Sequence, residues 1–287
     1  MCQLQNKEKV LRLMEGAYDL HTHTAPDFFP RALDDFKLME QADQYKMAGV
    51  MLKNHLDPTP ARAILANTQG YKAKAYGSAV MNLSIGGLNP IAAQKYLELG
   101  AKIIWMPTIH SRNQIEYSKI DNKIQSAGIR LLDDDGNLKP EVLEILDLIK
   151  EYEAAVATGH ISIGESIAVC TAARERGIKT ILTHPDWACT MIPIEIQKLL
   201  VSKGVIVEKL WFDIGLNLIS AEYMAQTIKE LGPENCFMAT DRGQAGMEFP
   251  AEGLMMFMDA MLEQGLSYEQ VYCMTHENPA KIIGCHS

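Results

Sequence analysis

Two histidines separated by a single residue, His21 and His23, are the first feature of this sequence that indicates chemistry. They follow a short apolar run, and side chains at positions i and i+2 of a strand point to the same face. Both imidazoles can therefore bind one ion from a single backbone segment. The same spacing also occurs by chance on surface strands, so the pair needs support from elsewhere in the chain.

Three further residues of metal-binding type stand at the ends of later apolar segments. His160 closes one such segment, His184 closes a second and Asp241 closes a third. Residues scattered by chance would also fall within helices or at the starts of strands, and none of these does. Neutral imidazole and carboxylate suit zinc and similar divalent ions. The sequence therefore predicts a divalent metal centre of one or two ions, with zinc the expected ion and with these ligands: His21, His23, His160, His184 and Asp241.

The elements that must position these residues alternate regularly between strand and helix. Apolar runs typical of buried strands occupy residues 17–20, 50–55, 75–81, 102–106, 154–160, 180–184, 205–208 and 237–241. Such alternation predicts a parallel sheet covered by helices, and eight units meet the requirement for a (β/α)8 TIM barrel of the α/β class. The carboxyl ends of barrel strands form one face, so the proposed ligands are expected to meet there.

One region interrupts this alternation after the fourth strand. Residues 128–132 and 137–139 flank a run of aspartates and a glycine, which predicts a small hairpin insertion. No linker divides the rest, and 287 residues suit one barrel, so a single domain over 1–287 is expected.

Composition narrows the classes of partner. The net charge of -9 argues against nucleic acid or an anionic membrane, because both favour a basic surface. No apolar run approaches the ~20 residues of a membrane span and no signal-peptide core is present, so a cytoplasmic location is expected. The six cysteines form no CxxC motif. The expected partner is a small-molecule substrate, and a homo-oligomer stays open.

The order of the proposed ligands along the chain resembles the amidohydrolase superfamily of metal-dependent barrel hydrolases. The resemblance extends from Ala17 to Gly284 and includes the final helix motif Asn278-Pro279-Ala280-Lys281. Its motifs define a superfamily and no single substrate.

The resemblance also implies a division of roles among the ligands. His21 and His23 would hold one ion together with Asp241. His160 and His184 would hold a second ion, or one of them would complete a single-ion site. In such enzymes the aspartate takes a proton from the metal-bound water, so the resemblance makes Asp241 the expected catalytic residue.

Lys53 marks a departure from the superfamily pattern. The bridging ligand of two-metal members, a carboxylated lysine or a glutamate, usually comes from a middle strand such as the fourth, but residues 102–110 end in neither. Lys53, at the end of the second strand, is the available lysine. Two cations would repel its ammonium group, so it can act as a bridging metal ligand only as a carbamate. The alternatives are an anchor for a substrate carboxylate or a salt bridge to Asp57.

Two further residues are predicted to contact substrate. His55 shares the face of Lys53 and is a candidate substrate contact or ligand, or else a loop histidine with a structural partner. Arg242 follows Asp241 into a rim loop and could bind an acidic substrate, although an arginine there, like Arg31, is also compatible with a solvated surface charge.

Glu208 ends the seventh strand. It could orient a ligand histidine from outside the metal site, or it could pair with the adjacent Lys209 or with a neighbouring helix.

These features favour a metal-dependent, amidohydrolase-like hydrolase acting on a small molecule with an amide, lactone or ester bond. The alternatives are a phosphoesterase or decarboxylase on a similar barrel, and a non-catalytic binding protein that contains metal. A phosphoesterase calls for several converging cations, and only Lys53 and Arg242 are well placed. A binding protein calls for a closed ligand shell, whereas Asp241 suits an open site.

Overall fold

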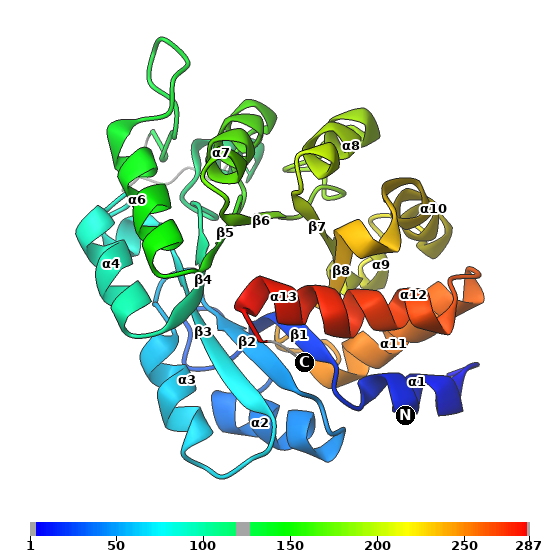
Figure 1. Cartoon of the computed structure of the whole chain (residues 1–287). Helices are drawn as coiled ribbons and strands as arrows, with labels where there is room; N and C mark the ends of the chain where they lie inside the picture. The colour runs from blue at the N-terminus through cyan, green and yellow to red at the C-terminus, as the bar shows by residue number, and fades with distance from the viewer. Residues whose placement is uncertain (1–3, 119–126, 286–287) are drawn as a thin grey trace. The chain divides into compact units, whose positions relative to one another are not determined.

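Eight parallel strands alternate with helices in the computed structural model of the chain, which describes residues 4–118 and 127–285 (Figure 1). The strands are β1 (Tyr18–His23), β2 (Gly49–Lys53), β3 (Lys74–Val80), β4 (Ala101–Trp105), β5 (Ala155–Ala157), β6 (Lys179–Leu182), β7 (Ile206–Leu210) and β8 (Cys236–Ala239). Their order in the sheet is their order in the sequence. This topology confirms the predicted (β/α)8 barrel.

Helices follow most of the strands. The α-helices are α1 (Lys7–Met14), α2 (Asp35–Gln44), α3 (Pro60–Asn67), α4 (Pro90–Glu98), α5 (Arg112–Ser118), α6 (Pro140–Glu151), α7 (Ile163–Glu175), α8 (Ile194–Ser202), α9 (Trp211–Gly215), α10 (Ala221–Leu231), α11 (Pro250–Glu263), α12 (Tyr268–Tyr272) and α13 (Asn278–Ile283). Two short 3-10 helices (Leu83–Ile85 and Pro233–Asn235) and one π-helix (Cys273–Glu277) complete the described elements.

Local sequence explains where several helices begin. The Ser162 side chain accepts a hydrogen bond from the backbone of Glu165, and the Glu165 side chain accepts one from the backbone of Ser162, which fixes the start of α7. Asn89 caps α4 in a similar way, and Pro90 occupies its first turn. The helices therefore start close to the residues that the sequence indicates.

The chain falls into two compact units. The terminal unit comprises Met1–Lys53, Ala61–Gly77 and Glu208–Ser287, and the central unit comprises Asn54–Pro60 and Ser78–Val207. Strand β3 begins in the terminal unit and ends in the central unit, whereas β7 runs from the central into the terminal unit. A single domain over 1–287 stays a prediction.

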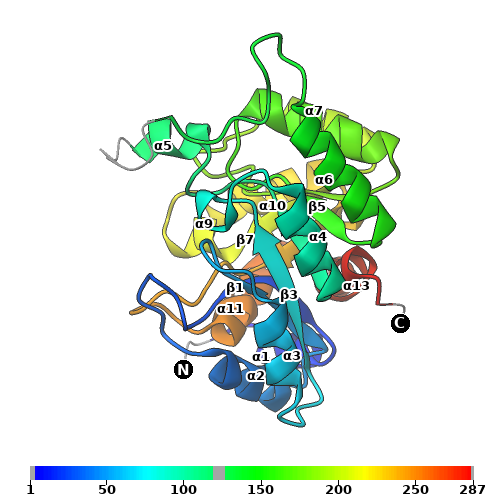
Figure 2. The same ribbon diagram turned by 90° about the vertical axis from the view of Figure 1, so that its left-hand side faces the viewer.

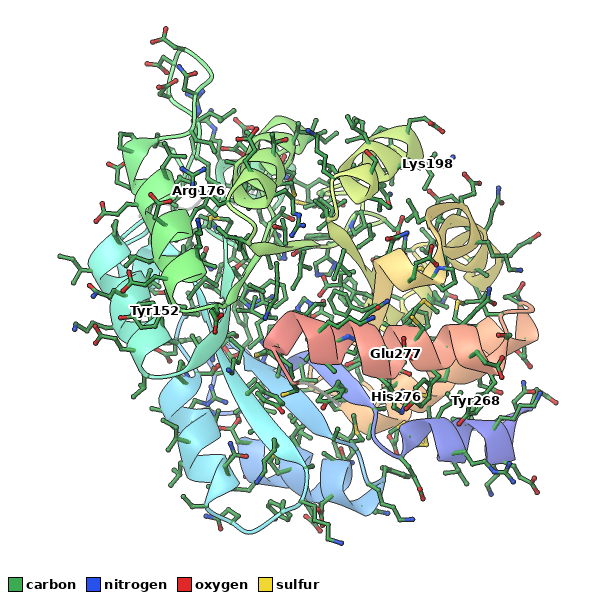
Figure 3. All side chains as sticks on the ribbon, viewed as in Figure 1. Tyr152, Arg176, Lys198, Tyr268, His276 and Glu277 are labelled. Atoms are coloured by element: carbon green, nitrogen blue, oxygen red, sulfur yellow. The ribbon has the colours of Figure 1, made fainter. Side chains whose placement is uncertain are left out.

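In the terminal unit, β1 pairs in parallel with β2, and the register places His23 beside Lys53. On the other edge of β1, Thr22 forms a bridge to Arg242 after β8. Helices α1, α11 and α12 pack against one another (Figure 1). His276, labelled in Figure 3, lies in the π-helix, and its Nε2 is 3.0 Å from the carbonyl oxygen of Glu15 after α1. The closing helices thus pack on the first helix.

In the central unit, β5 lies between β4 and β6. The core beneath α4, α6 and α7 is built of buried aliphatic side chains, among them Ile104, Ile145, Ile149 and Val156. Leu132 and Leu138 form an antiparallel bridge around a turn in which Asp133 Oδ1 accepts hydrogen bonds from the Asp135 and Asn137 backbones. This is the predicted hairpin, which projects beyond α6 and α7 at the top of Figures 1 and 2.

The strands are shorter than the apolar runs suggest. His55 and His160, expected as the last residues of their strands, lie two and three positions beyond the ends of β2 and β5. Each of these two histidines therefore stands on the loop that leaves the strand, where its backbone is free of sheet geometry. Within the described residues, the helices are all too short or too polar to cross a membrane, and the cytoplasmic location stays a prediction.

Gly159 brings one of these loops close to a neighbouring strand. Its φ is +64°, and a Cβ at this position would lie 2.2 Å from the carbonyl oxygen of Met106. Only glycine tolerates both the left-handed backbone and this approach. Backbone conformation and packing therefore require glycine at position 159, directly before His160.

Replacing Gly159 by alanine is expected to lower the free energy of unfolding more than the same change at Gly177. Gly177 also has a positive φ, +76°, but a Cβ there would meet no atom of the described residues within 4 Å, so Gly177→Ala measures backbone strain alone, about 1–2 kcal/mol. Gly159→Ala adds a backbone clash that should cost at least ~2 kcal/mol more. Urea unfolding of both variants tests this, and equal losses would contradict the close approach.

Candidate metal centre

Three of the predicted ligands lie together in the terminal unit. Asp241 Oδ1 is 3.2 Å from His21 Nε2 and 3.0 Å from His23 Nε2, and the two imidazole rings have their centroids 5.5 Å apart. His21 and His23 are at most 1% exposed, and Asp241 is 7% exposed. Two imidazole nitrogens and one carboxylate oxygen thus converge, which is a donor set that suits a divalent ion.

Glu208 contacts the His21 ring at Nδ1, the nitrogen that does not face Asp241. The Nδ1 of His21 donates to Glu208 Oε1 at 2.9 Å, and both side chains are fully buried. With Nδ1 held by Glu208, Nε2 is the ring nitrogen that faces Asp241 and can bind a metal ion. Of the two roles that the sequence allowed for Glu208, this geometry matches the orientation of a predicted ligand histidine.

The electrostatics of the two histidines differ. Burial acts to lower the pKa of His21, but the carboxylates of Asp241 and Glu208 outweigh it and leave the pKa above its ordinary value. Burial lowers the pKa of His23 to about 3, so this ring is neutral at physiological pH. A cation is therefore favoured beside His21, between the carboxylates, and a divalent ion can replace the proton there.

Asp19 is a residue of this region to which the sequence assigned no role. Its carboxylate is fully buried and accepts hydrogen bonds from the backbones of His21 and Thr240, at 3.2 and 3.1 Å, and from the Thr240 hydroxyl at 2.6 Å. Burial raises the pKa of Asp19 to about 7. The side chain ties the end of β8 to β1, and the sequence signal was an aspartate inside an apolar run.

Lys53 lies near the three candidate ligands and interacts electrostatically with Asp241. It lies opposite His23 in the β1–β2 pair and is 1% exposed. Burial lowers its pKa to about 8, even though the carboxylates of Asp241 and Glu208 act to raise it. A lysine with a lowered pKa offers the neutral amine that carbamate formation needs.

The side chains of Arg31 and Arg242 are buried. Neither is therefore the solvated surface charge that the sequence left open as an alternative. The Arg31 side chain is 4% exposed, with its Nη2 2.7 Å from Asp27 Oδ2 and 3.2 Å from His23 Nδ1. Arg242 is 1% exposed and donates from Nε to Glu248 at 2.6 Å. Both guanidinium groups therefore have ordered positions within the terminal unit.

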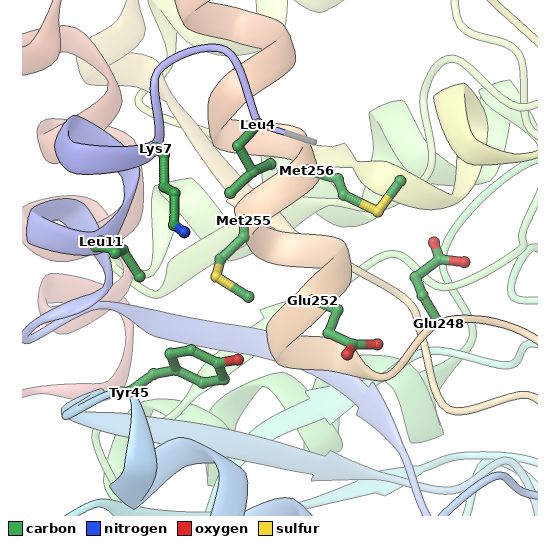
Figure 4. A pocket seen from close by; sticks show the side chains of 8 residues that line it. All are labelled: Leu4, Lys7, Leu11, Tyr45, Glu248, Glu252, Met255 and Met256. Carbon is green, nitrogen blue, oxygen red and sulfur yellow. The ribbon is translucent and has the colours of Figure 1, made fainter. Parts of the chain in front are cut away.

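Glu248 connects Arg242 to a separate cavity. This carboxylate also accepts a hydrogen bond from the Trp211 indole, and it lines a cavity of about 380 Å³ with α1 and α11 (Figure 4). The cavity walls are largely apolar: Leu4, Leu11, Met255 and Met256. The side chain of Arg242 thus points to this network, and its role in substrate binding stays a prediction.

The other predicted ligands, His160 and His184, gather in the central unit. Their ring centroids are 5.2 Å apart, and His55 lies 5.8 Å from His160. The indole of Trp187 contacts both rings, at 5.2 and 5.4 Å. His160 is 5% and His184 3% exposed, so these imidazoles form one buried cluster.

Two side chains of the central unit fix this cluster. His160 Nδ1 donates to the side-chain oxygen of Gln114 on α5, and His55 Nδ1 is 2.8 Å from the hydroxyl of Thr108. Asn82 in turn donates to the Thr108 hydroxyl at 2.7 Å and to the His55 carbonyl at 2.8 Å. The sequence did not identify Gln114, because it lies in the irregular region after the fourth strand and carries no metal-ligand signal.

The backbone is unusual at one ligand candidate of each unit. His184 has a φ of +48° and Asp241 a φ of +50°, a left-handed conformation that residues other than glycine rarely adopt. Such conformations cost about 1–3 kcal/mol and cluster at functional sites. Both residues follow closely after their strands at the carboxyl face, so the strain supports a functional role for these two positions.

The fold of the chain is similar to that of several solved proteins. An amidohydrolase from Pseudomonas aeruginosa is 12% identical, with 95% of this chain and 97% of that chain covered and a TM-score of 0.66. The organophosphorus hydrolase from Deinococcus radiodurans is 12% identical, with 96% and 94% covered and a TM-score of 0.56. A 2,6-dihydroxybenzoate decarboxylase from Rhizobium is 10% identical, with 94% and 99% covered and a TM-score of 0.55. The resemblance indicated by the motifs is confirmed at the level of the fold.

Comparison by sequence places the chain in a family. The model of a family described as "Family of unknown function (DUF6282)" matches residues 16–208. No curated protein matches the chain. The matched residues include every predicted ligand except Asp241.

Removing the Glu208 carboxylate is expected to weaken divalent metal binding. Glu208→Ala should lower zinc affinity by about 10–100-fold because the His21 ring loses the acceptor that fixes its proton, and Glu208→Gln, which keeps an acceptor oxygen, should lose less. Competition with a coloured chelator measures the affinity. Glu40→Ala, a change at an exposed carboxylate of the same unit, is the control. An unchanged affinity in Glu208→Ala would contradict the orienting role.

Proposed function

The chain belongs to the DUF6282 family of unknown function, and from its candidate site we propose that it is a metal-dependent hydrolase. The proposed substrate is a small molecule with an amide, lactone or ester bond. The observation that carries the proposal is the approach of one Asp241 carboxylate oxygen to the Nε2 atoms of His21 and His23, at 3.2 and 3.0 Å.

The residues present fit a divalent ion. His21 and His23 present imidazole nitrogens and Asp241 a carboxylate, and the Nδ1 proton of His21 is held by Glu208. A divalent ion, with zinc the expected one, lowers the pKa of a bound water toward ~7 and polarises a substrate carbonyl. An ion held by these three side chains would still be able to bind that water.

Asp241 is the proposed catalytic residue. Its carboxylate lies beside both ligand imidazoles and is 7% exposed, so it can accept a proton from an attacking water and return it to the leaving group. Glu208 keeps His21 in one orientation while that proton moves. Burial of the group excludes bulk water, which strengthens each electrostatic interaction within it.

The remaining predicted ligands have proposed roles of their own. We assign His160 and His184 to a second ion, supported by their ring separation of 5.2 Å and by the Gln114 contact that fixes His160. Lys53 is the proposed bridging ligand as its carbamate, and its buried position and lowered pKa support this. His55 and Arg242 are proposed as substrate contacts.

Metal removal is expected to abolish hydrolysis. Protein purified without chelator should contain one or two divalent ions per chain by elemental analysis, and activity on a panel of amides, lactones and esters should disappear with a chelator and return with zinc. Asp241→Asn should lower kcat by at least ~100-fold through loss of the proton acceptor. Asp134→Asn, in the exposed hairpin, is the control. Equal turnover by the metal-free protein would contradict the proposed mechanism.

A carboxylated Lys53 predicts an added mass of one carbon dioxide. Intact mass measured under non-denaturing conditions at pH 8 with bicarbonate should show it in the wild type and not in Lys53→Ala, because burial lowers the lysine pKa to about 8 and so enlarges the reactive neutral fraction. The exposed Lys37→Ala variant should keep the added mass. If the masses of the wild type and Lys53→Ala differ only by the substitution itself, Lys53 carries no carbon dioxide and is reassigned to substrate binding.

A further inference from the structure

We propose that Asp27 is a positioning residue for the metal ligand His23, and that Arg31 occupies its place until metal binds. The inference rests on the proposed metal centre, whose first ligands are His21, His23 and Asp241. It concerns the loop after β1, which includes Asp27 and Arg31.

Arg31 lies between His23 and Asp27. Its Nη2 is 3.2 Å from His23 Nδ1 and 2.7 Å from Asp27 Oδ2, and its Nε donates to the same Asp27 oxygen at 2.8 Å. The Asp27 side chain is fully buried, and its other oxygen accepts a hydrogen bond from the Phe29 backbone at 3.1 Å. One guanidinium group thus separates a carboxylate from the back of a ligand imidazole.

This contact determines the tautomer of His23. A guanidinium group only donates hydrogen bonds, so His23 Nδ1 must accept. A neutral imidazole carries one proton, which is then on Nε2, where Asp241 Oδ1 accepts it at 3.0 Å. Both ring nitrogens of His23 thus have a partner of the opposite hydrogen-bonding kind.

The same tautomer is wrong for a metal ligand. An ion bound at Nε2 needs the lone pair of that nitrogen, which moves the proton to Nδ1 and sets it against the N–H groups of Arg31. Two donors cannot share this contact. Metal binding at His23 therefore requires Arg31 to leave Nδ1 and an acceptor to take its place.

Asp27 is the acceptor that the structure supplies. Its Oδ2 binds the same arginine nitrogen that contacts His23. His21 already has such an arrangement, because its Nδ1 donates to Glu208. Ligand histidines commonly donate their second ring nitrogen to a carboxylate. The two histidines of this segment thus differ. His21 has a carboxylate acceptor at Nδ1, as a metal ligand needs, whereas His23 has a guanidinium donor there.

The backbone of the loop is anchored, so the exchange can be limited to the side chains of Arg31 and Asp27. Arg62 donates to the backbone oxygens of Pro26 and Thr24 at 3.0 and 3.2 Å. At the other end of the loop, the backbones of Arg31 and Gln244 form a bridge. The Phe29 ring lies 5.8 Å from the Arg31 guanidinium carbon and offers a second contact for the displaced group.

The first test reads the His23 tautomer directly. Long-range ¹H–¹⁵N spectra of ¹⁵N-histidine protein resolve the ring nitrogens of its eight histidines, and His23→Gln assigns the signal. Metal-free wild type should show the proton on Nε2, and zinc should move it to Nδ1. In Arg31→Met the proton should move to Nδ1 at a lower zinc concentration than in the wild type, because no guanidinium donor opposes it. Arg62→Met, which loosens the loop but keeps Arg31, should show the wild-type tautomer.

The second test measures zinc affinity by chelator competition in the same variants. Asp27→Ala should bind zinc about 10–100-fold more weakly, with the loss reduced in Asp27→Asn, which keeps an acceptor oxygen. Arg31→Met should bind zinc more tightly than wild type, because no donor opposes the required tautomer. The double variant Asp27→Ala/Arg31→Met should bind more weakly than Arg31→Met alone.

The outcomes separate this inference from the metal centre itself. If the wild type binds zinc but its metal-free His23 ring already carries the proton on Nδ1, the exchange is overturned and the metal centre stands. The same holds if Arg31→Met weakens zinc binding as much as Asp27→Ala does. Wild-type protein that shows the Nε2 tautomer and binds no zinc would overturn the metal centre and the exchange together.

Discussion

The buried carboxylate of Asp19 holds β1 and the end of β8 in register, and the arrangement of the candidate metal centre depends on this. It accepts hydrogen bonds from the backbones of His21 and Thr240 and from the Thr240 hydroxyl, so it joins residues two and 221 positions away in the sequence. Because Asp241 follows Thr240 directly, the same contacts fix where its carboxylate lies relative to the His21 ring. A buried carboxylate is costly unless its hydrogen bonds are satisfied, so this register is well determined.

Charge balance explains why the group around Asp241 is suited to a cation. Asp27, Glu208 and Asp241 place three carboxylates in a largely buried region, where Lys53 and Arg31 are the nearby cations. The pKa of Lys53 falls to about 8 and that of His23 to about 3, so burial reduces the positive charge that side chains can supply. A divalent ion can supply that charge, because direct bonds to imidazole and carboxylate ligands offset the loss of its hydration shell.

Much of the fold could be predicted from sequence, because it depends on local patterns. The apolar runs and helix caps identify the eight strand–helix units, and they place His160 and His184 in the loops that follow β5 and β6. The site is predicted only in part. His21, His23 and Asp241 come together as expected, and Glu208 was identified as a residue that could orient one of them.

The remaining side chains depend on contacts that no local pattern encodes. Gln114 meets His160 only because an irregular segment forms α5, and amide side chains carry no signal for a metal site. The burial of Arg31 depends on the course of the loop after β1, and hydrogen bonds from Arg62 on α3 hold that loop. Hydrogen bonds between distant loops of this kind decide which charges are buried, and periodicity does not report them.

Anomalous diffraction from crystals of the zinc-loaded protein tests the central claim most directly. The structure predicts a zinc peak about 2.0–2.2 Å from Nε2 of His21, from Nε2 of His23 and from a carboxylate oxygen of Asp241. A zinc peak bound elsewhere, with these three side chains hydrogen-bonded to one another as they are here, would contradict the assignment of this group as the metal centre.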